Sequence, residues 1–538
     1  MLMLIHKLKK NKGITLIALV VTIIVLLILA GISISMLMGQ NGILNRVVEA
    51  KEKTALSNNN EKHDLVKMEE LINDSLDEEK VEQINDENPG ILEQEASDNN
   101  GYIINSIEDF VVFSYNVTNG DTYEGKTIKL GVNLDFNSTK SYNNAFREDY
   151  GEYGYEGELR ENLISKIGWN SIGNKININQ NSFKGTFDGN NKCIYNLYIN
   201  NKNINETKFI GLFANNQGII KNLKLKNVKI ETSGNDEVYY FVAGIAGGNE
   251  GTILNCSTNG ICKSNGNYAL AAGISGRNQG IIESCMNEIN VSGRAMYMSG
   301  IVAQNLYKIK KCGNNGTISS EKDGKYIGGI TGLGYSDNSL NGDSIIEESF
   351  NKGKIVVNAS SSLHVGGIVG QAQCWIKNCY NMGDITFNTE NEEINCNLGG
   401  IAGVQVGLIQ NCYNKNLIKE EKNNGNIFVG GIIGSFHQYT LKNLYSETTF
   451  ETGDSVKKGG TIGLIVDEPN VLEVKNLNFY GQEESIGSNL SKFDFNSNKL
   501  NEKPSHVKIL EFVNDDNENK FKEDKNNINE GYPVLYWQ

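Results

Sequence analysis

The chain has 538 residues, including 58 glycines, 4 prolines and 9 cysteines, and its formal net charge is −14. Nucleic-acid-binding proteins present basic patches that neutralise the phosphate backbone, so this acidic balance argues against a nucleic acid as partner. The cysteines form no CxxC pair, and no group of cysteines and histidines has the spacing of zinc ligands. Five of them recur at one position of a repeat. We therefore expect buried apolar side chains rather than a metal site, and no cofactor.

Residues 14–38 contain no charged side chain, and a helix needs only about 20 apolar residues to cross the hydrocarbon core of a bilayer. The stretch is longer than the apolar region of a secretory signal peptide, which spans roughly 7–15 residues. Lysines precede it, and cationic flanks stay on the cytoplasmic side of a membrane. The sequence therefore predicts a single membrane-spanning helix at 14–38 in the cell membrane. Its N-terminus would lie in the cytoplasm and the rest of the chain outside the cell.

The junction between residues 1–13 and this helix resembles the leader of type IV prepilins. The resemblance is carried by Lys9-Lys10-Asn11-Lys12-Gly13 followed by Ile14-Thr15-Leu16-Ile17. It implies that a prepilin peptidase cuts between Gly13 and Ile14 and methylates Ile14, and that other pilin-like subunits are partners. The family usually carries Glu at the fifth mature position, where this chain has Ala18. An uncut membrane anchor is the alternative.

Residues 39–97 have the composition of a helical stalk that leads into a polar linker. In the first part, Glu49 and Lys53 are spaced i,i+4, which supports a helix. In residues 61–84, apolar residues at helical spacing form one stripe: Leu65, Met68, Leu71, Ile72 and Leu76. The polar and acidic residues around 85–100 are typical of a linker.

Residues 205–480 contain a repeat that begins at a glycine followed by an apolar residue. These anchor glycines are Gly211, Gly244, Gly273, Gly300, Gly329, Gly367, Gly400, Gly431 and Gly460. Twelve residues after an anchor stand Leu223, Cys256, Cys285, Cys312, Cys379 and Cys412. A period of about 20–50 residues marks units that bury their apolar faces only by stacking on one another.

The predicted fold class is mainly β: a parallel β-helix (solenoid) preceded by the membrane helix and the helical stalk. Short apolar runs separated by glycines suit strand–turn–strand coils. The Cys/Leu position is expected to face inward as a ladder, with Phe350 in the same place after an insertion near 335–343, and Leu444 one residue late. The Asn that often precedes this position, as at Asn255, is expected at a turn, because Asn tolerates unusual backbone angles.

The repeats also resemble the GLUG family. Gly366-Gly367-Ile368-Val369-Gly370 with Ile376-Lys377-Asn378-Cys379-Tyr380 matches its pattern, and so does Gly399-Gly400-Ile401-Ala402-Gly403 with Ile409-Gln410-Asn411-Cys412-Tyr413. The resemblance covers 205–480 and implies an extracellular β-helix with a binding or spacer role, as in bacterial surface proteins and adhesins. It implies no catalytic residue.

Two flanking regions fit the same picture. Residues 98–204 are expected to form the opening region of the β-helix, with 106–135 as its first coil and 183–191 as the turn that starts the regular stack. Residues 481–538 are expected to cap the other end, where 529–537 would form a closing strand, because an open solenoid exposes strand edges.

The search for catalytic chemistry finds no motif. No histidine belongs to an HExxH zinc site, and neither a GxSxG elbow nor a phosphate-binding loop occurs. Asp188 is the best acidic candidate, but the Asp-Gly-Asn-Asn sequence is typical of a turn. His364 and His437 are interpreted as loop residues, and Trp375 as a core residue, while Trp169 and Trp537 could stack on a glycan. We therefore expect no enzyme activity and no metal site.

The function expected is that of a membrane-anchored bacterial surface protein whose solenoid serves adhesion or binding of a cell-wall or host glycan or protein. The alternatives are a minor type IV pilin-like or pseudopilin subunit and a β-helix enzyme that degrades polysaccharides. Binding residues concentrate on long loops of regular scaffolds. The insertion is therefore the candidate binding loop, beginning with Tyr335, Ser336, Asp337, Asn338 and Ser339.

Overall fold

The computed structural model describes one compact unit within residues 91–538. The described residues are 93–94, 101–136, 171–172 and 182–538, with gaps at 119, 236, 323, 337–343, 390–392, 424, 482, 492–496 and 515–519. The predicted leader, membrane helix and cleavage site at Gly13 and Ile14 lie outside these residues. So does the predicted stalk and linker at 39–97, except that Glu93–Gln94 form strand β1, which pairs with β2 (Gly101–Ile104). In the described part, no helix is long and apolar enough to span a membrane.

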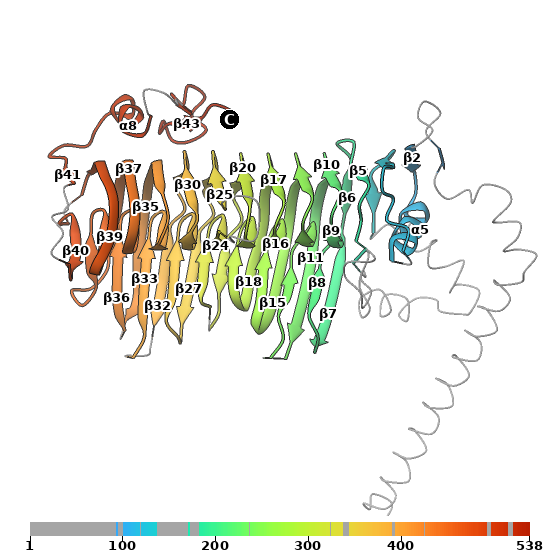
Figure 1. Ribbon diagram of the computed structural model, residues 1–538, viewed down its shortest axis with the longest axis horizontal. Coiled ribbons are helices and arrows are strands. Elements are labelled where there is room, and N and C mark those ends of the chain that lie inside the picture. Colours follow the sequence, from blue (N-terminus) through green and yellow to red (C-terminus); the bar gives the residue numbers. More distant parts are fainter. Residues whose placement is uncertain are drawn as a thin grey trace, which may run out of the picture. The chain divides into compact units, whose positions relative to one another are not determined.

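The predicted parallel β-solenoid is confirmed (Figure 1). Strands of one coil pair in parallel with the equivalent strands of the coils before and after it. One sheet of the stack shows this most simply, because its strands occupy the same register from coil to coil. It contains β3 (Thr127–Leu130), β5 (Thr186–Asp188), β10 (Ile219–Lys221), β14 (Thr252–Leu254), β17 (Ile281–Glu283), β20 (Lys308–Lys310), β25 (Ile345–Glu347) and β30 (Trp375–Lys377).

Around each anchor glycine the chain makes a sharp turn between two strands, which we call the first and second arms. The first arms are β8 (Lys208–Ile210), β12 (Tyr240–Val242), the ends of β15 (Ser257–Ala272) and β18 (Met286–Ser299), β23 (Tyr326–Gly328), β28 (Leu363–Gly366), β33 (Asn395–Gly399), β36 (Asn426–Gly430) and β38 (Lys457–Gly459). The second arms are β9 (Phe213–Asn216), β13 (Ala246–Asn249), β16 (Ser275–Asn278), β19 (Val302–Asn305), β24 (Thr331–Tyr335), β29 (Val369–Gln373), β34 (Ala402–Gln405) and the starts of β37 (Ile433–Glu451) and β39 (Ile462–Phe479).

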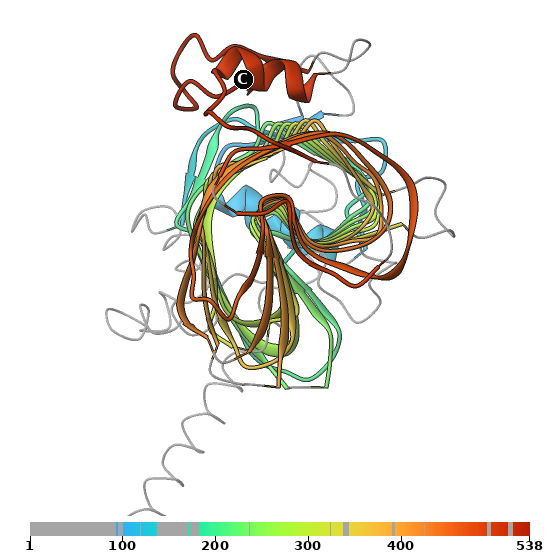
Figure 2. The same cartoon turned by 90° about the vertical axis from the view of Figure 1, so that its left-hand side faces the viewer.

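The turn between the arms reaches inward to the opposite wall of the coil (Figure 2). A Cβ atom on an anchor glycine would come closer than 3.0 Å to a buried asparagine of that wall. The pairs are Gly273 with Asn287, Gly300 with Asn314, Gly329 with Asn351, Gly367 with Asn381, and Gly400 with Asn414. The anchor must therefore be glycine because two chain segments touch there, whereas no left-handed backbone angle is required.

The glycine three residues after the anchor serves a second close contact. At Gly370, Gly403 and Gly434, a Cβ atom would meet the backbone of the first arm one coil earlier. The two arms therefore pack almost backbone to backbone at their base. The Gly-Gly-apolar-apolar-Gly pattern therefore reflects two separate contacts, and neither leaves room for a Cβ atom.

The opposite wall carries a ladder of buried asparagines that links successive coils. The Nδ2 atom of each donates to the Oδ1 atom of the next at 2.8 Å, from Asn287 through Asn314, Asn351 and Asn381 to Asn414. At Asn351 the same side chain also donates to Gly353 O and accepts from Gly353 N. A buried amide left without partners would be costly, so this pairing lets polar side chains occupy the interior.

The inward cysteine ladder is confirmed. Leu223, Cys256, Cys285, Cys312, Cys379 and Cys412 are all buried, and Leu444 pairs with Cys412 as the late position. Phe350 does not take this place. It pairs with Gly313, so Ser349 faces inward and accepts a hydrogen bond from Cys312 N at 3.1 Å. The insertion is one residue shorter than the sequence alignment assumed, and Phe350 therefore points to the other side of the strand.

The asparagines before the cysteine position adopt the expected left-handed backbone, with φ of 54° at Asn222 and 52° at Asn255. Asn378, Asn411, Asn443 and Asn476 do the same. Three coils carry other residues there, and Ser284, Lys311 and Glu348 are held at φ of 55°, 51° and 50°. A residue other than Gly or Asn loses roughly 1–2 kcal/mol in this conformation.

We therefore expect Lys311→Asn to stabilise the protein, by about 0.5–1 kcal/mol, because Asn tolerates the left-handed region better than Lys. The measurement is the midpoint of denaturant unfolding. The reverse change at an equivalent position, Asn255→Lys, should lower it. Equal midpoints for all three chains would contradict the explanation.

At the N-terminal end of the stack, residues Ile107–Thr118 form helix α5 rather than part of the expected first coil. Ile107, Phe110, Phe113 and Val117 are fully buried at helical spacing, and Phe113 packs on Phe187 with ring centroids 5.6 Å apart. Ser106 caps the helix, since its Oγ atom accepts from Asp109 N at 3.0 Å. The helix therefore covers the aromatic end of the core.

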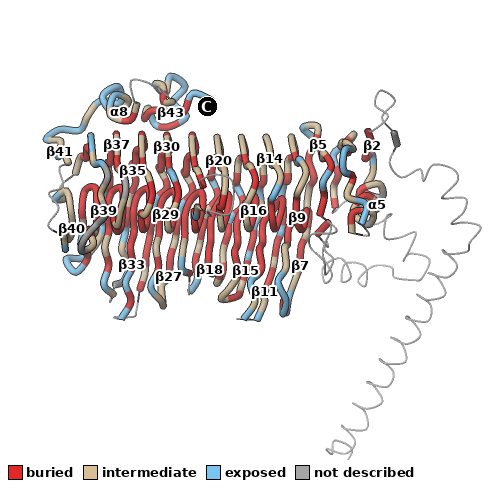
Figure 3. Tube along the Cα trace, in the orientation of Figure 1, coloured by how far each residue is buried: buried red, intermediate tan, exposed pale blue. Residues whose placement is uncertain are grey.

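Of residues 481–538, which were expected to cap the stack, β40 (Ile486–Asn489) and β41 (Asn498–Lys499) pair with β39 of the last coil. Residues 503–538, which we call the C-terminal segment, do not lie on the end of the stack. This segment runs back beside the coils, with helix α8 (His506–Val513) and the antiparallel pair β42 (Phe521–Lys522) and β43 (Val534–Leu535) (Figure 1). There it covers an outward row of stacked rings, Phe350, Tyr380, Tyr413 and Tyr445. Buried residues consequently occur in this segment as well as inside the coils (Figure 3).

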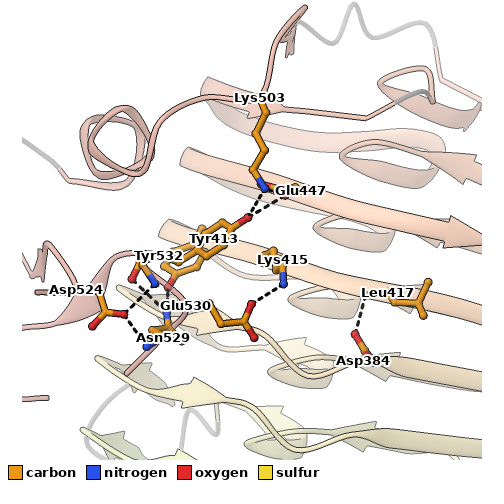
Figure 4. A network of polar contacts seen from close by, with 11 residues as sticks. Asp384, Tyr413, Lys415, Leu417, Glu447, Lys503, Asp524, Asn529, Glu530 and Tyr532 are labelled. Carbon is orange, nitrogen blue, oxygen red and sulfur yellow. Dashed lines mark hydrogen bonds and ion pairs between the residues drawn. The ribbon is translucent and has the colours of Figure 1, made fainter. Parts of the chain in front are cut away.

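Hydrogen bonds and ion pairs fix this segment (Figure 4). The Tyr413 hydroxyl donates to Pro533 O and accepts from Asn529 Nδ2. Glu447 accepts from Lys503 Nζ at 2.7 Å and from the Tyr532 hydroxyl at 2.8 Å. At the chain end, Trp537 Nε1 donates to Glu348 O at 2.9 Å. The C-terminal segment thus forms hydrogen bonds with several successive coils.

Candidate binding surface

Several tyrosines lie between the first and second arms of successive coils, apart from the main core. Tyr297, Tyr326 and His364 occupy one register of the first arms, three residues before their anchor glycines. Tyr239 and Tyr268 lie at the outer edge of the two preceding coils, with ring centroids 4.8 Å apart. We call these five residues the tyrosine seam. Tyr297 belongs to a cluster of buried side chains separate from the main core, and Tyr268 and Tyr326 pack against this cluster.

The rings of the seam stack on one another along the direction in which the coils stack. The centroids are 4.9 Å apart between Tyr297 and Tyr326, and 5.6 Å between Tyr326 and His364, with interplanar angles of 25° and 11°. These distances follow the separation of neighbouring parallel strands, about 4.8 Å. The faces of Tyr297, Tyr326 and His364 that meet one another are therefore occupied.

The seam hydroxyls have no hydrogen-bond partner within the described chain. No such bond joins the hydroxyl of Tyr239, Tyr268, Tyr297 or Tyr326 to the protein, and none of these oxygens is buried without a partner. Tyr239 is 45% exposed, whereas Tyr297 is buried, with 9% exposed. Burial, with the neighbouring phenols Tyr326 and Tyr239, raises the pKa of Tyr297. Burial also raises the pKa of Tyr326, so the hydroxyl groups of Tyr297 and Tyr326 stay protonated.

Of the predicted binding loop, Tyr335 and Ser336 lie within the described residues. Tyr335 ends β24, the second arm of the coil whose first arm carries Tyr326, and it is 42% exposed. Ser344 N donates to Ser336 Oγ at 3.1 Å, so the two ends of the insertion meet. Asp337, Asn338 and Ser339 lie outside the described residues. The candidate binding loop therefore stays a prediction.

The second arms supply polar groups opposite the rings. Four residues occupy equivalent positions on the second arms of successive coils and pair in the order Arg277, Gln304, Leu333 and Gln371. Leu333 packs in the same cluster as Tyr297. The surface thus combines amide groups, one guanidinium group and phenol hydroxyls.

His364 is not a loop residue, because it lies in β28 and is packed within the seam. Asn397 Nδ2 lies 3.1 Å from its Nδ1 atom. Burial, with His437 nearby, lowers the pKa of His364 from 6.5 to about 4. His437, in β37, also has a lowered pKa because of burial, and its Nε2 atom lies 3.1 Å from Ser435 Oγ. Both imidazoles are therefore neutral structural groups at neutral pH.

Acidification is expected to destabilise the protein through His364. In the unfolded chain its imidazole takes up a proton near pH 6.5, whereas in the folded chain it does so only near pH 4. Stability is therefore lost as the pH falls between these values, by at most about 3 kcal/mol. His364→Phe keeps a ring on Tyr326 and should flatten this part of the profile of unfolding free energy against pH. Parallel profiles for the two proteins would contradict the assignment.

Trp375 is not a core residue. It is 37% exposed at the outer face of β30, in register with Ile345, and Lys377 Nζ lies 4.8 Å from its ring centroid. Trp537 packs on Phe350 with centroids 5.9 Å apart and is therefore part of the C-terminal contact. Trp169 lies outside the described residues.

Asp188 has the geometry of a turn. Its Oδ1 atom accepts from Asn190 N at 2.8 Å and from Asn222 Nδ2 at 3.0 Å, and its Oδ2 atom lies 3.4 Å from Lys221 Nζ. Burial would raise the pKa of this carboxyl, but the bonds from Asn222 and Asn190 and the charge of Lys221 outweigh it and lower the pKa. A carboxylate held in this way is a poor proton donor.

The described residues contain no group of three or more His, Cys, Asp or Glu side chains placed to hold a metal ion. All nine cysteines are buried free thiols, and burial raises the pKa of Cys262 and Cys374 to about 12. Such thiols carry no appreciable thiolate at neutral pH.

A cavity of about 630 Å³ lies within the C-terminal segment, between Phe521, Lys522, Asp524 and Tyr536. The Asp524 carboxylate accepts hydrogen bonds there from Ile528 N and Asn529 N, and it thereby holds the loop that follows it.

The seam was missed from the sequence although a signal was available. The position three residues before the anchor reads Phe241, Leu270, Tyr297, Tyr326 and His364 in successive repeats. Apolar and aromatic residues at this position suggested burial. Only the pairing of the two arms shows that the position faces away from the main core.

No family model and no curated protein matches the chain. One solved structure is similar, described as "a putative immunoglobulin A1 protease from Bacteroides ovatus". It shares 17% identity over 84% of this chain and 96% of that chain, with a TM-score of 0.34. A TM-score of this size is too low to extend any property of that protein to this one.

Proposed function

We propose that the chain is a membrane-anchored bacterial surface protein whose solenoid binds an extracellular ligand and so serves adhesion. The observation that carries this proposal is the tyrosine seam. Tyrosines without a hydrogen bond to the described chain occur in successive coils, and the insertion that interrupts the repeat begins on the second arm of the coil that carries Tyr326. Tyrosine combines apolar contact area with a polar tip, which suits it to recognition surfaces. A rigid array of coils would hold these groups in fixed positions.

The anchor in this proposal is the apolar stretch 14–38, with the N-terminus in the cytoplasm and the solenoid outside the cell. Its support is the length of the uncharged stretch and the lysines that precede it. The described residues contribute no catalytic constellation, which favours binding over polysaccharide cleavage. Incubation of the full chain in detergent with acidic and neutral polysaccharides, followed by analysis of new chain ends, tests for the enzyme alternative.

The test of the binding proposal uses the full chain in detergent micelles against cell-wall, matrix and glycan fractions. We expect retention by at least one fraction, and weaker retention of Tyr239→Ala and Tyr335→Ala. Tyr536→Ala is the matched control, because Tyr536 is 57% exposed but lies in the C-terminal segment. Absence of retention above background by every fraction would refute the proposal.

A second candidate is a minor type IV pilin-like subunit, favoured by the sequence around Gly13 and Ile14. In this case a prepilin peptidase would cut the leader, and the solenoid would decorate a fibre. Mass spectrometry of the N-terminal peptide from the native membrane distinguishes the two. A methylated N-terminus at Ile14 supports the pilin-like subunit, whereas an N-terminus at Met1 or Leu2 leaves a simple anchor.

A further inference from the structure

The two ends of the solenoid stack are closed to different extents (Figure 1). At the N-terminal end, helix α5 covers the core with side chains that are fully buried. At the C-terminal end, the last long strand is β39, and β40 and β41 pair only with its residues 462–465 and 478–479. Within the described residues, no strand pairs with the far side of the stretch between these two pairings. We call this stretch, residues 466–477, the free edge.

The main core is incompletely covered at the free edge. Val474 occupies the inward position of the last coil. The equivalent residues of the three preceding coils are fully buried: Ile376, Ile409 and Leu441. Val474 and Val471, by contrast, are only partly buried. Apolar surface at the C-terminal end of the stack therefore remains in contact with solvent, and a further strand on the free edge would cover it.

The backbone of the free edge directs a hydrogen-bond donor away from the stack. In an earlier coil, Ile376 N donates to Leu408 O of the next coil at 2.8 Å. Val474 is the equivalent residue of the last coil, so its N–H group points to the free side, where no described strand pairs with it. An unpaired strand edge of this kind is a template for pairing with a strand of another chain.

The side chains of the free edge are complementary to themselves. Glu473 and Lys475 flank Val474 in β39, and both are exposed. When two copies of the strand pair antiparallel about Val474, each Glu473 lies opposite the Lys475 of the other copy. Opposite charges in directly opposite positions stabilise a pair of strands. Pro469 has no N–H group and would interrupt a longer pairing, so the contact is confined to the stretch 471–477.

We propose that the free edge pairs with the free edge of a second copy of this chain, so that two solenoids join through their C-terminal ends. The contact has two-fold symmetry, and such an interface must be self-complementary. Val474 of each copy exchanges both N–H···O bonds with its counterpart, as opposite residues of an antiparallel pair do. Helix α5 covers the N-terminal end of the stack, so the pairing ends at two copies.

This pairing gives the proposed adhesion a partner, and in that respect it rests on the proposed membrane anchor. The chain enters the solenoid at β2 and β3, at the end of the stack remote from the free edge (Figure 1). The N-terminal ends of the two paired solenoids therefore point in opposite directions. Copies anchored in two opposed membranes meet in this arrangement, which makes the protein a homophilic adhesin. A contact of a few residues is weak, and many copies on two surfaces act together.

The experiment uses charge reversals in the full chain in detergent micelles, with sedimentation velocity measured over a range of protein concentrations. The parent protein is expected to form dimers. Glu473→Lys and Lys475→Glu each place like charges opposite one another twice per dimer, and each should weaken self-association by roughly tenfold. An equimolar mixture of the two variants restores both ion pairs and should associate like the parent protein. Glu288→Lys changes an exposed charge on a central coil and is the matched control, which should dimerise like the parent protein.

The same proteins in phosphatidylcholine vesicles test the opposed arrangement through light scattering. Vesicles that carry the parent protein should aggregate, and vesicles that carry either charge variant alone should not. Mixing the two kinds of variant vesicle should restore aggregation. A monomeric parent protein, unchanged association of both variants, or a mixture that associates no better than either variant alone would each overturn the inference. Dimers in micelles without aggregation of parent vesicles would overturn the homophilic contact between membranes.

Retention by cell-wall, matrix and glycan fractions is measured in parallel, because it separates this inference from the proposed ligand binding. A parent protein that the fractions retain but that forms no dimer would overturn the pairing alone. A parent protein that pairs through the free edge but is retained by no fraction would support the pairing and refute the proposed ligand binding alone.

Discussion

Gly400→Ala is expected to lower the free energy of unfolding by about 3 kcal/mol, at the upper end of the usual effect of overpacking. The added Cβ atom would lie closer than 3.0 Å to Asn414 Nδ2 and to Gly431 O. Neither can yield freely, because Asn414 belongs to the asparagine ladder and Gly431 to the next coil. Denaturant unfolding followed by far-UV circular dichroism measures the change.

Gly481→Ala is the matched control, because the nearest atom to its added Cβ is Thr448 O at 3.7 Å. It should leave the midpoint almost unchanged. A loss at Gly481 as large as that at Gly400 would mean that the loss at Gly400 does not come from the close contact of the added Cβ atom, because the lower entropy of the unfolded chain by itself makes Gly→Ala stabilising. In that case the explanation of the anchor glycines would be wrong.

Removal of residues 503–538 is expected to have the second large effect. The segment buries Phe350, Tyr380, Tyr413 and Tyr445, which are at most 4% exposed. Burial of one large apolar side chain is worth about 1.5–3 kcal/mol, so the truncated chain should lose several kcal/mol of stability. It should also expose a continuous apolar row, and we expect binding of a hydrophobic dye and self-association in analytical ultracentrifugation.

The control keeps the segment but changes its outer side. Val507 and Tyr536 are 52% and 57% exposed, so Val507→Ala and Tyr536→Ala should leave both stability and oligomeric state unchanged. A truncated chain that keeps the oligomeric state of the parent protein, binds no dye and unfolds at the parent midpoint would show that the segment does not protect the aromatic row.

Several local features could be read from the sequence because each depends on one repeat and its neighbours. The anchor glycines, the buried cysteine position and the left-handed Asn255 recur at fixed offsets, and stacking in register turns such a recurrence into a ladder. The capping sequence Ser106–Asp109 was also readable and would have identified helix α5. The position of the insertion followed from the interruption of the period.

Other features depended on contacts between residues distant in the chain. Whether Phe350 or Ser349 faces inward is decided by strand pairing with the coil before the insertion. A shift of the pairing by one residue would turn every side chain of the strand to the opposite side. The path of the C-terminal segment is decided by an aromatic row contributed by four coils, which no single repeat reveals. Without the C-terminal segment these rings would be exposed to solvent.

The sequence by itself thus determined the solenoid, its repeat and the residues that must be glycine or asparagine, because these follow from short-range spacing and backbone preference. Only the tertiary structure decided which apolar positions belong to the core and which to the tyrosine seam. Tyr297 and Tyr326 look like core residues in the repeat, yet the inward turn at the anchor glycines places them between the first and second arms, apart from the main core. Burial of a side chain depends on what packs against its strand, and that is fixed only when the coils fold.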